Sequence, residues 1–251
     1  MIPAAALQPL LIAMLCAWIG GMALLHVLLL SPQLAPRLAG ARRMLLQEAF
    51  ILALPVVLVL LPHPWIWLAF AAFAARIICE ALIVLRAAPK QRRLPALVGF
   101  LIMPILPLIL LGVELDNKAH ATTLLLSLLL VEFFDSFALL GGRLFGRTPL
   151  APALSPNKTW EGFATGFLAL AVAALLLTLA GITTPAQAAW ATICTAAFAT
   201  LGDLAASWPK RNAGRKDYPV LLQGQGGMLD IYDAWIVAAP LTAIVLQRVL
   251  T

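Results

Sequence analysis

Long apolar runs separated by short polar connections make up nearly the whole chain. Eight of these runs are long enough to cross the roughly 30 Å hydrocarbon core of a bilayer as helices. They lie at residues 7–30, 46–62, 64–85, 96–113, 121–142, 162–181, 186–204 and 231–250. The second and third are separated only by Pro62-His63-Pro64, so a single long hairpin is an alternative there. The pattern predicts an all-α fold, a polytopic membrane helix bundle of about eight transmembrane helices.

Prolines inside several runs predict kinks rather than helix ends, because neighbouring helices in a membrane protein can accommodate the lost hydrogen bond. These are Pro9, Pro55, Pro104, Pro107 and Pro240.

The composition supports a membrane protein over a soluble domain. Of the 251 residues, 63% are hydrophobic and 11% are charged, whereas a soluble domain of this length needs more polar surface. The first run has no positively charged leading segment and is too long for the core of a signal peptide, so it predicts a retained span. The three cysteines have no metal-ligand spacing and are expected to be small core residues.

Positive charge gathers on alternate connections between the runs. By the positive-inside rule, this pattern predicts an inner-membrane protein with both termini outside and the four charged loops in the cytoplasm. The net charge is +6, and the cations lie beside the membrane spans. Anionic lipid head groups and a phosphorylated substrate are therefore the expected partners, and nucleic acid is not. The cations are Arg37, Arg42 and Arg43; Arg86, Lys90, Arg92 and Arg93; Arg143, Arg147 and Lys158; and Lys210, Arg211, Arg215 and Lys216.

Acidic residues inside the runs are the next signal. Arg76 and Glu80 lie four residues apart and are expected to form a structural ion pair. Glu132 and Asp135 share one helical face, and a lone carboxylate in lipid costs on the order of 3 kcal/mol, so both are expected to face the bundle interior. With Asp203, and with Asp230 and Asp233 in the last run, acidic groups from three spans are expected near the cytoplasmic face.

Two polar segments carry candidate chemistry. In residues 204–233, cations precede acids with Gly224-Gln225-Gly226-Gly227 between them, a combination that suits phosphate and a hard metal. In residues 141–162, Ser155-Pro156 has the form of a helix start with Lys158 and Glu161 on its first turns, which could bind phosphate. A charged loop and an ordinary helix cap are the plain alternatives. No Walker A or GxGxxG pattern is present, which excludes soluble P-loop and Rossmann classes.

The two segments together resemble the phosphatidate cytidylyltransferase (CDP-diacylglycerol synthase) family. The first block of the resemblance is Asp135-Ser136-Phe137-Ala138, Gly142-Arg143-Leu144-Phe145-Gly146-Arg147 and Ser155-Pro156-Asn157-Lys158-Thr159-Trp160-Glu161-Gly162. The second runs from Gly202-Asp203-Leu204-Ala205-Ala206-Ser207 through Lys210-Arg211, Lys216-Asp217 and Gly226-Gly227 to Asp230 and Asp233. Residues 1–130 match only as hydrophobic spans, so 131–251 is expected to be the catalytic membrane region of one integral unit.

The resemblance implies transfer of CMP from CTP to phosphatidic acid, giving CDP-diacylglycerol and pyrophosphate in the bilayer, with Mg²⁺ as cofactor. It leaves a homodimer open. The metal ligands would be Asp135, Asp203, Asp230 and Asp233. The catalytic residues would be Lys158, Glu161, Lys210, Arg211, Lys216 and Asp217. The substrate-binding residues would be Ser155, Ser207, Arg215, Gln225, Gly226 and Gly227.

Two positions depart from the family signature. Gln225 stands where the family has His, and Ile231 where it has Arg. A Gln cannot titrate and an Ile cannot bind phosphate, so Arg215 is expected to replace the missing cation. The alternatives are a cytidylyltransferase for another phosphorylated lipid, or a transport or non-catalytic relative of the same fold.

Overall fold

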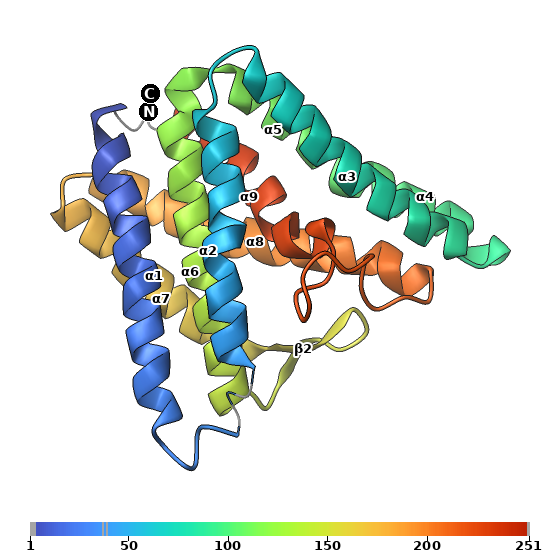
Figure 1. Cartoon of the computed structure of the whole chain (residues 1–251), viewed down its shortest axis with the longest axis horizontal. Coiled ribbons are helices and arrows are strands. Elements are labelled where there is room, and N and C mark those ends of the chain that lie inside the picture. Colours follow the sequence, from blue (N-terminus) through green and yellow to red (C-terminus); the bar gives the residue numbers. More distant parts are fainter. Residues whose placement is uncertain (1–3, 37, 39, 250–251) are drawn as a thin grey trace.

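The computed structural model describes residues 4–36, 38 and 40–249, and it confirms a polytopic helical membrane protein (Figure 1). Within this part of the chain, seven helical segments are long and apolar enough to cross a membrane, and the apolar part of an eighth, Ala49–Leu60, is shorter. The helices are α1 Leu7–Leu29, α2 Ala41–Leu60, α3 Trp65–Ala87, α4 Arg93–Phe100, α5 Leu106–Asp116, α6 Ala121–Phe145, α7 Trp160–Leu179, α8 Pro185–Asn212 and α9 Met228–Val249. Short helical turns are η1 Ala4–Ala6, η2 Lys90–Arg92, η3 Leu101–Ile105 and η4 Lys118–His120.

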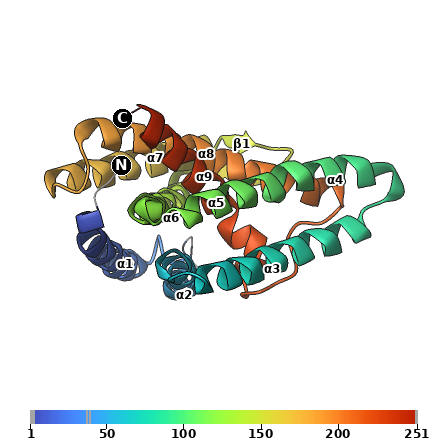
Figure 2. The ribbon, with the colours of Figure 1, turned by 90° about the horizontal axis from the view of Figure 1, so that it is seen from above.

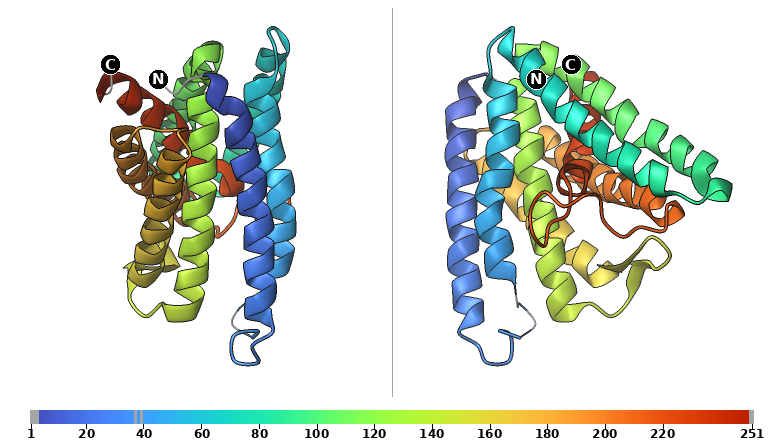
Figure 3. Two further views of the ribbon diagram at one scale, coloured as in Figure 1. Left: turned by 90° about the vertical axis from the view of Figure 1, so that its left-hand side faces the viewer. Right: turned by 45° about the vertical axis from the view of Figure 1, so that its right-hand side comes forward.

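The helices form two differently inclined groups. α1, α2 and α6 run nearly parallel or antiparallel to one another, whereas α3 and α4 run side by side at a large tilt, away from α1 (Figures 1 and 2). Figure 3 shows α1 and α2 as an antiparallel pair along one side of the bundle. The core lies where α9 packs between α6, α8 and the α3–α5 group, and Trp235 on α9 is among its largest fully buried side chains.

The connections alternate between two ends of the molecule. Figure 1 places the α2–α3 and α5–α6 turns at the top, and the α1–α2 connection and the strand hairpin at the bottom. This alternation follows the alternation of charge along the sequence. Arg37 and the side chain of Arg42 lie outside the described residues.

Prolines inside two of the helices have different local consequences. The segment from Lys90 to Asp116 is one apolar span, but Met103, just before Pro104, leaves helical geometry with φ −141° and ψ 111°. This confirms the predicted kink at Pro104. In α2, Pro55 has no N–H to donate to the carbonyl of Ile51, four residues earlier. The buried hydroxyl of Tyr232 on α9 donates to that carbonyl at 2.9 Å. This hydrogen bond satisfies the carbonyl that the proline leaves unpaired, and it links α2 to α9.

We expect Tyr232→Phe to lower the free energy of unfolding by about 1–2 kcal/mol, because the Ile51 carbonyl then stays buried without a partner. In a Pro55→Ala background the helix can supply its own N–H, so the same Tyr232→Phe change should cost less. Thermal unfolding of the two single variants and the double variant in detergent measures this coupling. Strictly additive effects would contradict the pairing.

Residues 149–159 form a hairpin rather than a helix start. Strand β1 (Pro149–Ala151) pairs antiparallel with β2 (Ser155–Thr159). The predicted helix start at Ser155-Pro156 is therefore wrong: α7 begins at Trp160, with the Thr159 hydroxyl accepting from the Gly162 amide at 3.1 Å. The residue before a proline is biased toward extended backbone, and Thr159 offers a second good cap directly before the apolar run.

The end of α8 also differs from the prediction. Lys210 and Arg211 were expected in a loop, but α8 continues through Pro209 to Asn212. Cations at a helix C-terminus interact favourably with its dipole. The hydroxyl of Tyr218 donates to the carbonyl of Ala206 at 3.1 Å, which ties the following loop to this last stretch of helix.

Candidate functional site

A cavity of about 720 Å³ lies between the α1–α2 pair and the rest of the bundle. One wall is apolar and consists of residues from α1, α2 and the connection between them. The opposite wall carries the polar and charged side chains among several apolar ones, and comes mainly from α6, β2, α8, α9 and the loop before α9. The apolar wall includes Gly21, Leu24, Leu25, Leu28, Leu38 and Ile51, and the polar wall includes Glu132, Asp135, Arg143, Ser155, Lys158, Asp203, Gln225, Asp230 and Asp233. The cavity can thus accommodate a polar group and a hydrocarbon chain together.

Close packing of α8 on α9 brings two of the carboxylates together. Gly202 lies against the backbone of Asp233, since a Cβ built on Gly202 would meet the Asp233 carbonyl oxygen at 2.6 Å. Only glycine permits this approach. Asp203, the next residue on α8, therefore faces the first turns of α9. Asp233 is 6% exposed, and its Oδ1 accepts from the Ala234 amide at 2.7 Å.

Lys158 joins the carboxylates from the strand side. Its ammonium forms an ion pair with Asp203. Burial by itself would lower the pKa of the Lys158 ammonium, but the negative charges of Asp203, Asp135 and Asp233 outweigh it and raise the pKa. Lys158 is therefore a fixed positive charge among three carboxylates. The structure brings these four residues together from α6, β2, α8 and α9.

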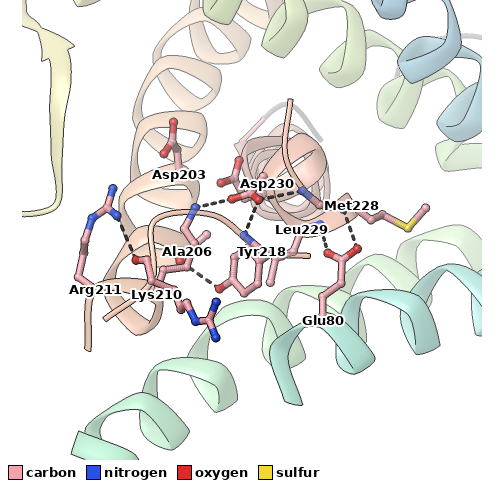
Figure 4. Close-up of polar contacts among 12 residues, drawn as sticks. Glu80, Asp203, Ala206, Lys210, Arg211, Tyr218, Met228, Leu229 and Asp230 are labelled. Atoms are coloured by element: carbon pink, nitrogen blue, oxygen red, sulfur yellow. Dashed lines mark hydrogen bonds and ion pairs between the residues drawn. The ribbon is translucent and has the colours of Figure 1, made fainter. Parts of the chain in front are cut away.

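Asp230 organises the loop between α8 and α9 (Figure 4). Its Oδ1 accepts from the Lys210 ammonium, and its Oδ2 accepts from the amides of Tyr218 at 2.8 Å and Gly227 at 2.9 Å. Lys210 also lies 5.0 Å from the centre of the Tyr218 ring. Burial, and then the negative charges of Asp230, Asp233 and Glu80, raise the pKa of the Tyr218 hydroxyl. That hydroxyl therefore stays protonated and donates to α8.

Arg211 ties this loop to the hairpin. Its Nε donates to the Leu154 carbonyl at 2.9 Å, and its Nη1 donates to the Arg215 carbonyl at 3.1 Å. The guanidinium thus bridges the β1–β2 turn and the first residues of the loop. Lys210 and Arg211 do not line the cavity; both are engaged by the chain itself.

The paired glycines before α9 accommodate two carboxylates of the chain. Gly226 has φ +91°, and a Cβ there would meet Asp230 Oδ2 at 2.4 Å. A Cβ on Gly227 would meet Glu80 Oε2 at 2.6 Å. The sequence indicated only that a backbone without side chains lets a ligand approach closely. In the structure, each glycine instead admits one acidic side chain of the protein.

Other predicted site residues lie away from the cavity wall. Arg215, Lys216 and Asp217 are exposed on the loop and are not among the residues that line the cavity. Ser207 is buried on α8. Glu161 accepts from the amides of Arg147 and Thr148, both at 3.1 Å, and holds the start of the hairpin against α7.

Both departures from the family signature line the cavity, as do several residues that the sequence did not single out. Gln225 and Ile231 are part of the wall. The apolar wall from α1 was missed, because its leucines have no pattern that separates them from lipid-facing ones. Arg143 was identified as a loop cation and as part of the first family block, but not as a site residue. The predicted Arg76–Glu80 ion pair is confirmed at 2.9 Å, but the contact of Glu80 with α9 was missed.

The carboxylates match the chemistry of a magnesium site. Mg²⁺ prefers carboxylate oxygens and keeps several waters, so it needs few protein ligands. Asp135, Asp203 and Asp233 all raise the pKa of the Lys158 ammonium, so their negative charges act on the same part of the cavity. Within the described chain, no three His, Cys, Asp or Glu side chains lie close enough to hold a metal ion as they stand. A bound ion would therefore use waters or substrate oxygens beside one or two of these aspartates.

Fold and site together define a polytopic membrane protein with one amphipathic, carboxylate-lined cavity among its helices. Comparison with known families is more specific: the model of the cytidylyltransferase family matches residues 1–249. The chain belongs to the cytidylyltransferase family.

Three relatives illustrate the similarity. A phosphatidate cytidylyltransferase of Rickettsia bellii is 34% identical over 153 residues, 58% of this chain and 66% of that protein. One from Haemophilus influenzae is 36% identical over 141 residues, 52% of this chain and 49% of that protein. The chloroplastic phosphatidate cytidylyltransferase 5 of Arabidopsis thaliana is 38% identical over 135 residues, 49% of this chain and 32% of that protein. The chain thus spans between about a third and two thirds of these relatives' lengths.

Proposed function

We propose that this protein transfers CMP from CTP to phosphatidic acid, releasing pyrophosphate and leaving CDP-diacylglycerol in the bilayer. The observation that carries the proposal is a cavity that has carboxylates and an ammonium on one wall and an apolar opposite wall from α1 and α2. A lipid phosphate needs both walls, because its head group is charged and its chains are apolar. The family membership and the names of the relatives support the same reaction.

The reaction forms one bond and breaks another at the α-phosphorus of CTP. An oxygen of the lipid phosphate attacks that phosphorus, and the bond to the β-phosphate oxygen breaks as pyrophosphate leaves. A Mg²⁺ ion held by one or two of Asp135, Asp203 and Asp233, with waters or substrate oxygens, would neutralise the negative charge that develops on the leaving group. Because the phosphoryl oxygen of the lipid is already anionic, no protein nucleophile is needed.

Lys158 is the cation placed to hold a substrate phosphate. It lines the cavity on a strand, and its present partner, Asp203, would be shared with the metal ion. Arg143 on α6 is the second cation of the wall. Lys210, Asp230 and Arg211 would act through position, since they hold the loop that carries Gln225 against the cavity.

CTP is expected to reach the cavity from the cytoplasm. We propose an inner-membrane location in which the hairpin and the α8–α9 loop face the cytoplasmic side, because the charged connections alternate with nearly uncharged ones. Cysteines introduced at Lys90 and Arg215 should resist an impermeant thiol reagent added to intact cells. Labelling from outside would reverse this orientation.

The deciding assay uses the purified full chain with radiolabelled CTP and a panel of lipid phosphates, with and without Mg²⁺. We expect incorporation of label into lipid with phosphatidic acid, and no incorporation after chelation of divalent ions. A second candidate function, a cytidylyltransferase for another phosphorylated lipid, is favoured by the neutral Gln225 and Ile231 in the wall. Label entering only another lipid of the panel would replace the first candidate by the second. No label with any lipid would reject both.

A further inference from the structure

The most deeply buried acid of the described chain lies on α3, outside residues 131–251, where the family motifs lie. Glu80 is 0% exposed. Its Oε1 accepts from the amide of Met228 and its Oε2 from the amide of Leu229, both at 2.9 Å (Figure 4). Arg76, one turn earlier on α3, contacts the same carboxylate at 2.9 Å. A carboxylate 148 residues earlier in the chain thus meets the first turn of α9.

This contact caps the N-terminus of α9, as a side chain just before the helix does in other helices. The first amides of a helix have no partner within it, and a Ser, Thr, Asn or Asp just before the helix usually supplies one. Before α9 stand Gln225, Gly226 and Gly227, so the local sequence offers no such side chain. Glu80 satisfies two of the orphan amides, and its negative charge is favourable at the positive end of the helix dipole.

Gly227 shows how closely the two parts fit. A Cβ on this residue would meet Glu80 Oε2 at 2.6 Å and the Cβ of Tyr218 at 2.8 Å. The glycine therefore leaves the space that the carboxylate occupies. Asp230 holds the neighbouring Gly227 amide at 2.9 Å, so two carboxylates together fix the first turn of α9.

We propose that Glu80 is a positioning residue for the reaction, which sets where α9 begins and which way its first turns face. Asp230 and Asp233 follow on those turns, so their placement against Asp203 and Lys158 depends on Glu80. This inference rests on the proposed cytidylyltransferase function. It also makes α3 a necessary part of the catalytic region, which the resemblance limited to residues 131–251.

Glu80→Gln tests the inference with little change in size. The Gln oxygen can accept from one amide, but its NH₂ group turns a donor toward the other. We expect kcat to fall by about 10–100-fold, the usual range for residues that orient a catalytic ligand, with the KM for CTP changed by less than about threefold. Glu80→Asp keeps the charge and should recover part of the loss.

Arg76→Gln is the matched control. It removes the same ion pair and leaves both amide contacts of Glu80 in place. We therefore expect its activity to stay within about fivefold of wild type, with a lower melting temperature because the buried carboxylate loses one partner. Hydrogen exchange of the peptide that contains Met228 and Leu229 gives a readout besides activity. Exchange should accelerate in Glu80→Gln and not in Arg76→Gln.

The activity and the exchange measurements together test whether Glu80 positions α9 for the reaction. Faster exchange with an unchanged kcat would overturn the positioning role, and so would equal losses in Glu80→Gln and Arg76→Gln. If Glu80→Gln does not fold, Glu80→Asp carries the test: wild-type kcat in that variant, with accelerated exchange at residues 228 and 229, would reject the inference. A wild-type protein without transferase activity would reject the proposed function instead, and the exchange result would still report on the Glu80 contact.

Discussion

Asp233→Asn is expected to abolish lipid labelling, with a loss of at least about 10³-fold, or roughly 4 kcal/mol of transition-state stabilisation. Asn keeps the shape of the side chain and can still accept from the Ala234 amide, a contact of 2.7 Å. It removes the charge of a residue that is 6% exposed and lies in the cavity wall. If that charge holds the metal ion, turnover fails while the fold remains.

The same substitution should leave the melting temperature unchanged or raise it. Asp233 is a buried carboxylate close to Asp203 and Asp230, so removing its charge relieves repulsion and desolvation in the folded state. A gain in stability together with loss of activity is typical of residues kept for function.

Asp230→Asn and Asp116→Asn complete the comparison. Asp230→Asn should also stop turnover, but with a lower melting temperature, because the ion pair with Lys210 and the loop contacts weaken. Asp116 is exposed at the end of α5, and Asp116→Asn should behave as wild type. Lipid labelling and thermal unfolding in detergent check all three variants. Activity of Asp233→Asn within a few fold of wild type would rule out the proposed metal role.

Lys158→Met is expected to lower kcat/KM for CTP by about 10²–10³-fold, the usual loss when one preorganised charge at a transition state is removed. Methionine keeps much of the aliphatic stem but carries no charge. The site then has Asp135, Asp203 and Asp233 without the cation that faces them, so a triphosphate is repelled more strongly. Steady-state kinetics with varied CTP at fixed lipid measures the effect.

Lys90→Met is the control for the loss of a cation near the membrane. Lys90 is exposed on the α3–α4 connection, and this variant should stay within about twofold of wild type, as expected for a surface site. Activity of Lys158→Met within about twofold of wild type would contradict this role, and phosphate binding would then be assigned to the other predicted cations. Lys158→Arg keeps the charge with a different donor geometry and should retain more activity than Lys158→Met.

The sequence predicts the helices well because length and apolarity alone decide a membrane span. All eight predicted runs coincide with helices, and the Arg76–Glu80 pair follows from its spacing of four residues. The sequence places Asp203 and Asp233 near the same face, but their close approach is not visible in it, because it depends on Gly202 touching the backbone of another helix. The helix start at Ser155 failed because two adjacent segments each carry a good cap and only the pairing of β2 with β1 decides between them.

The roles of the charged residues were harder to predict than their presence. Lys158 and Lys210 are both cations in motifs, yet only Lys158 lines the cavity, whereas Lys210 is consumed by Asp230. From the sequence, Arg76 is the expected partner of the Glu80 carboxylate. The spacing of residues identifies neighbours on the same helix, but it cannot identify a contact with α9. The one available signal was the glycine pair before α9. Paired glycines indicate that another group packs closely against the backbone, but they do not identify that group.

The capping of α9 limits how many backbone donors remain to bind an anion at the start of this helix. A free helix N-terminus attracts phosphate, sulfate or carboxylate through its unpaired amides, whatever molecule carries them. In α9, the amides of Gly227, Met228 and Leu229 are already occupied by Asp230 and Glu80. In α7, Trp160 donates to the Thr148 carbonyl at 2.9 Å and Gly162 to Thr159. Several of the first amides at both helix starts are therefore engaged by the chain, which leaves fewer unpaired backbone donors there for a free phosphate or sulfate.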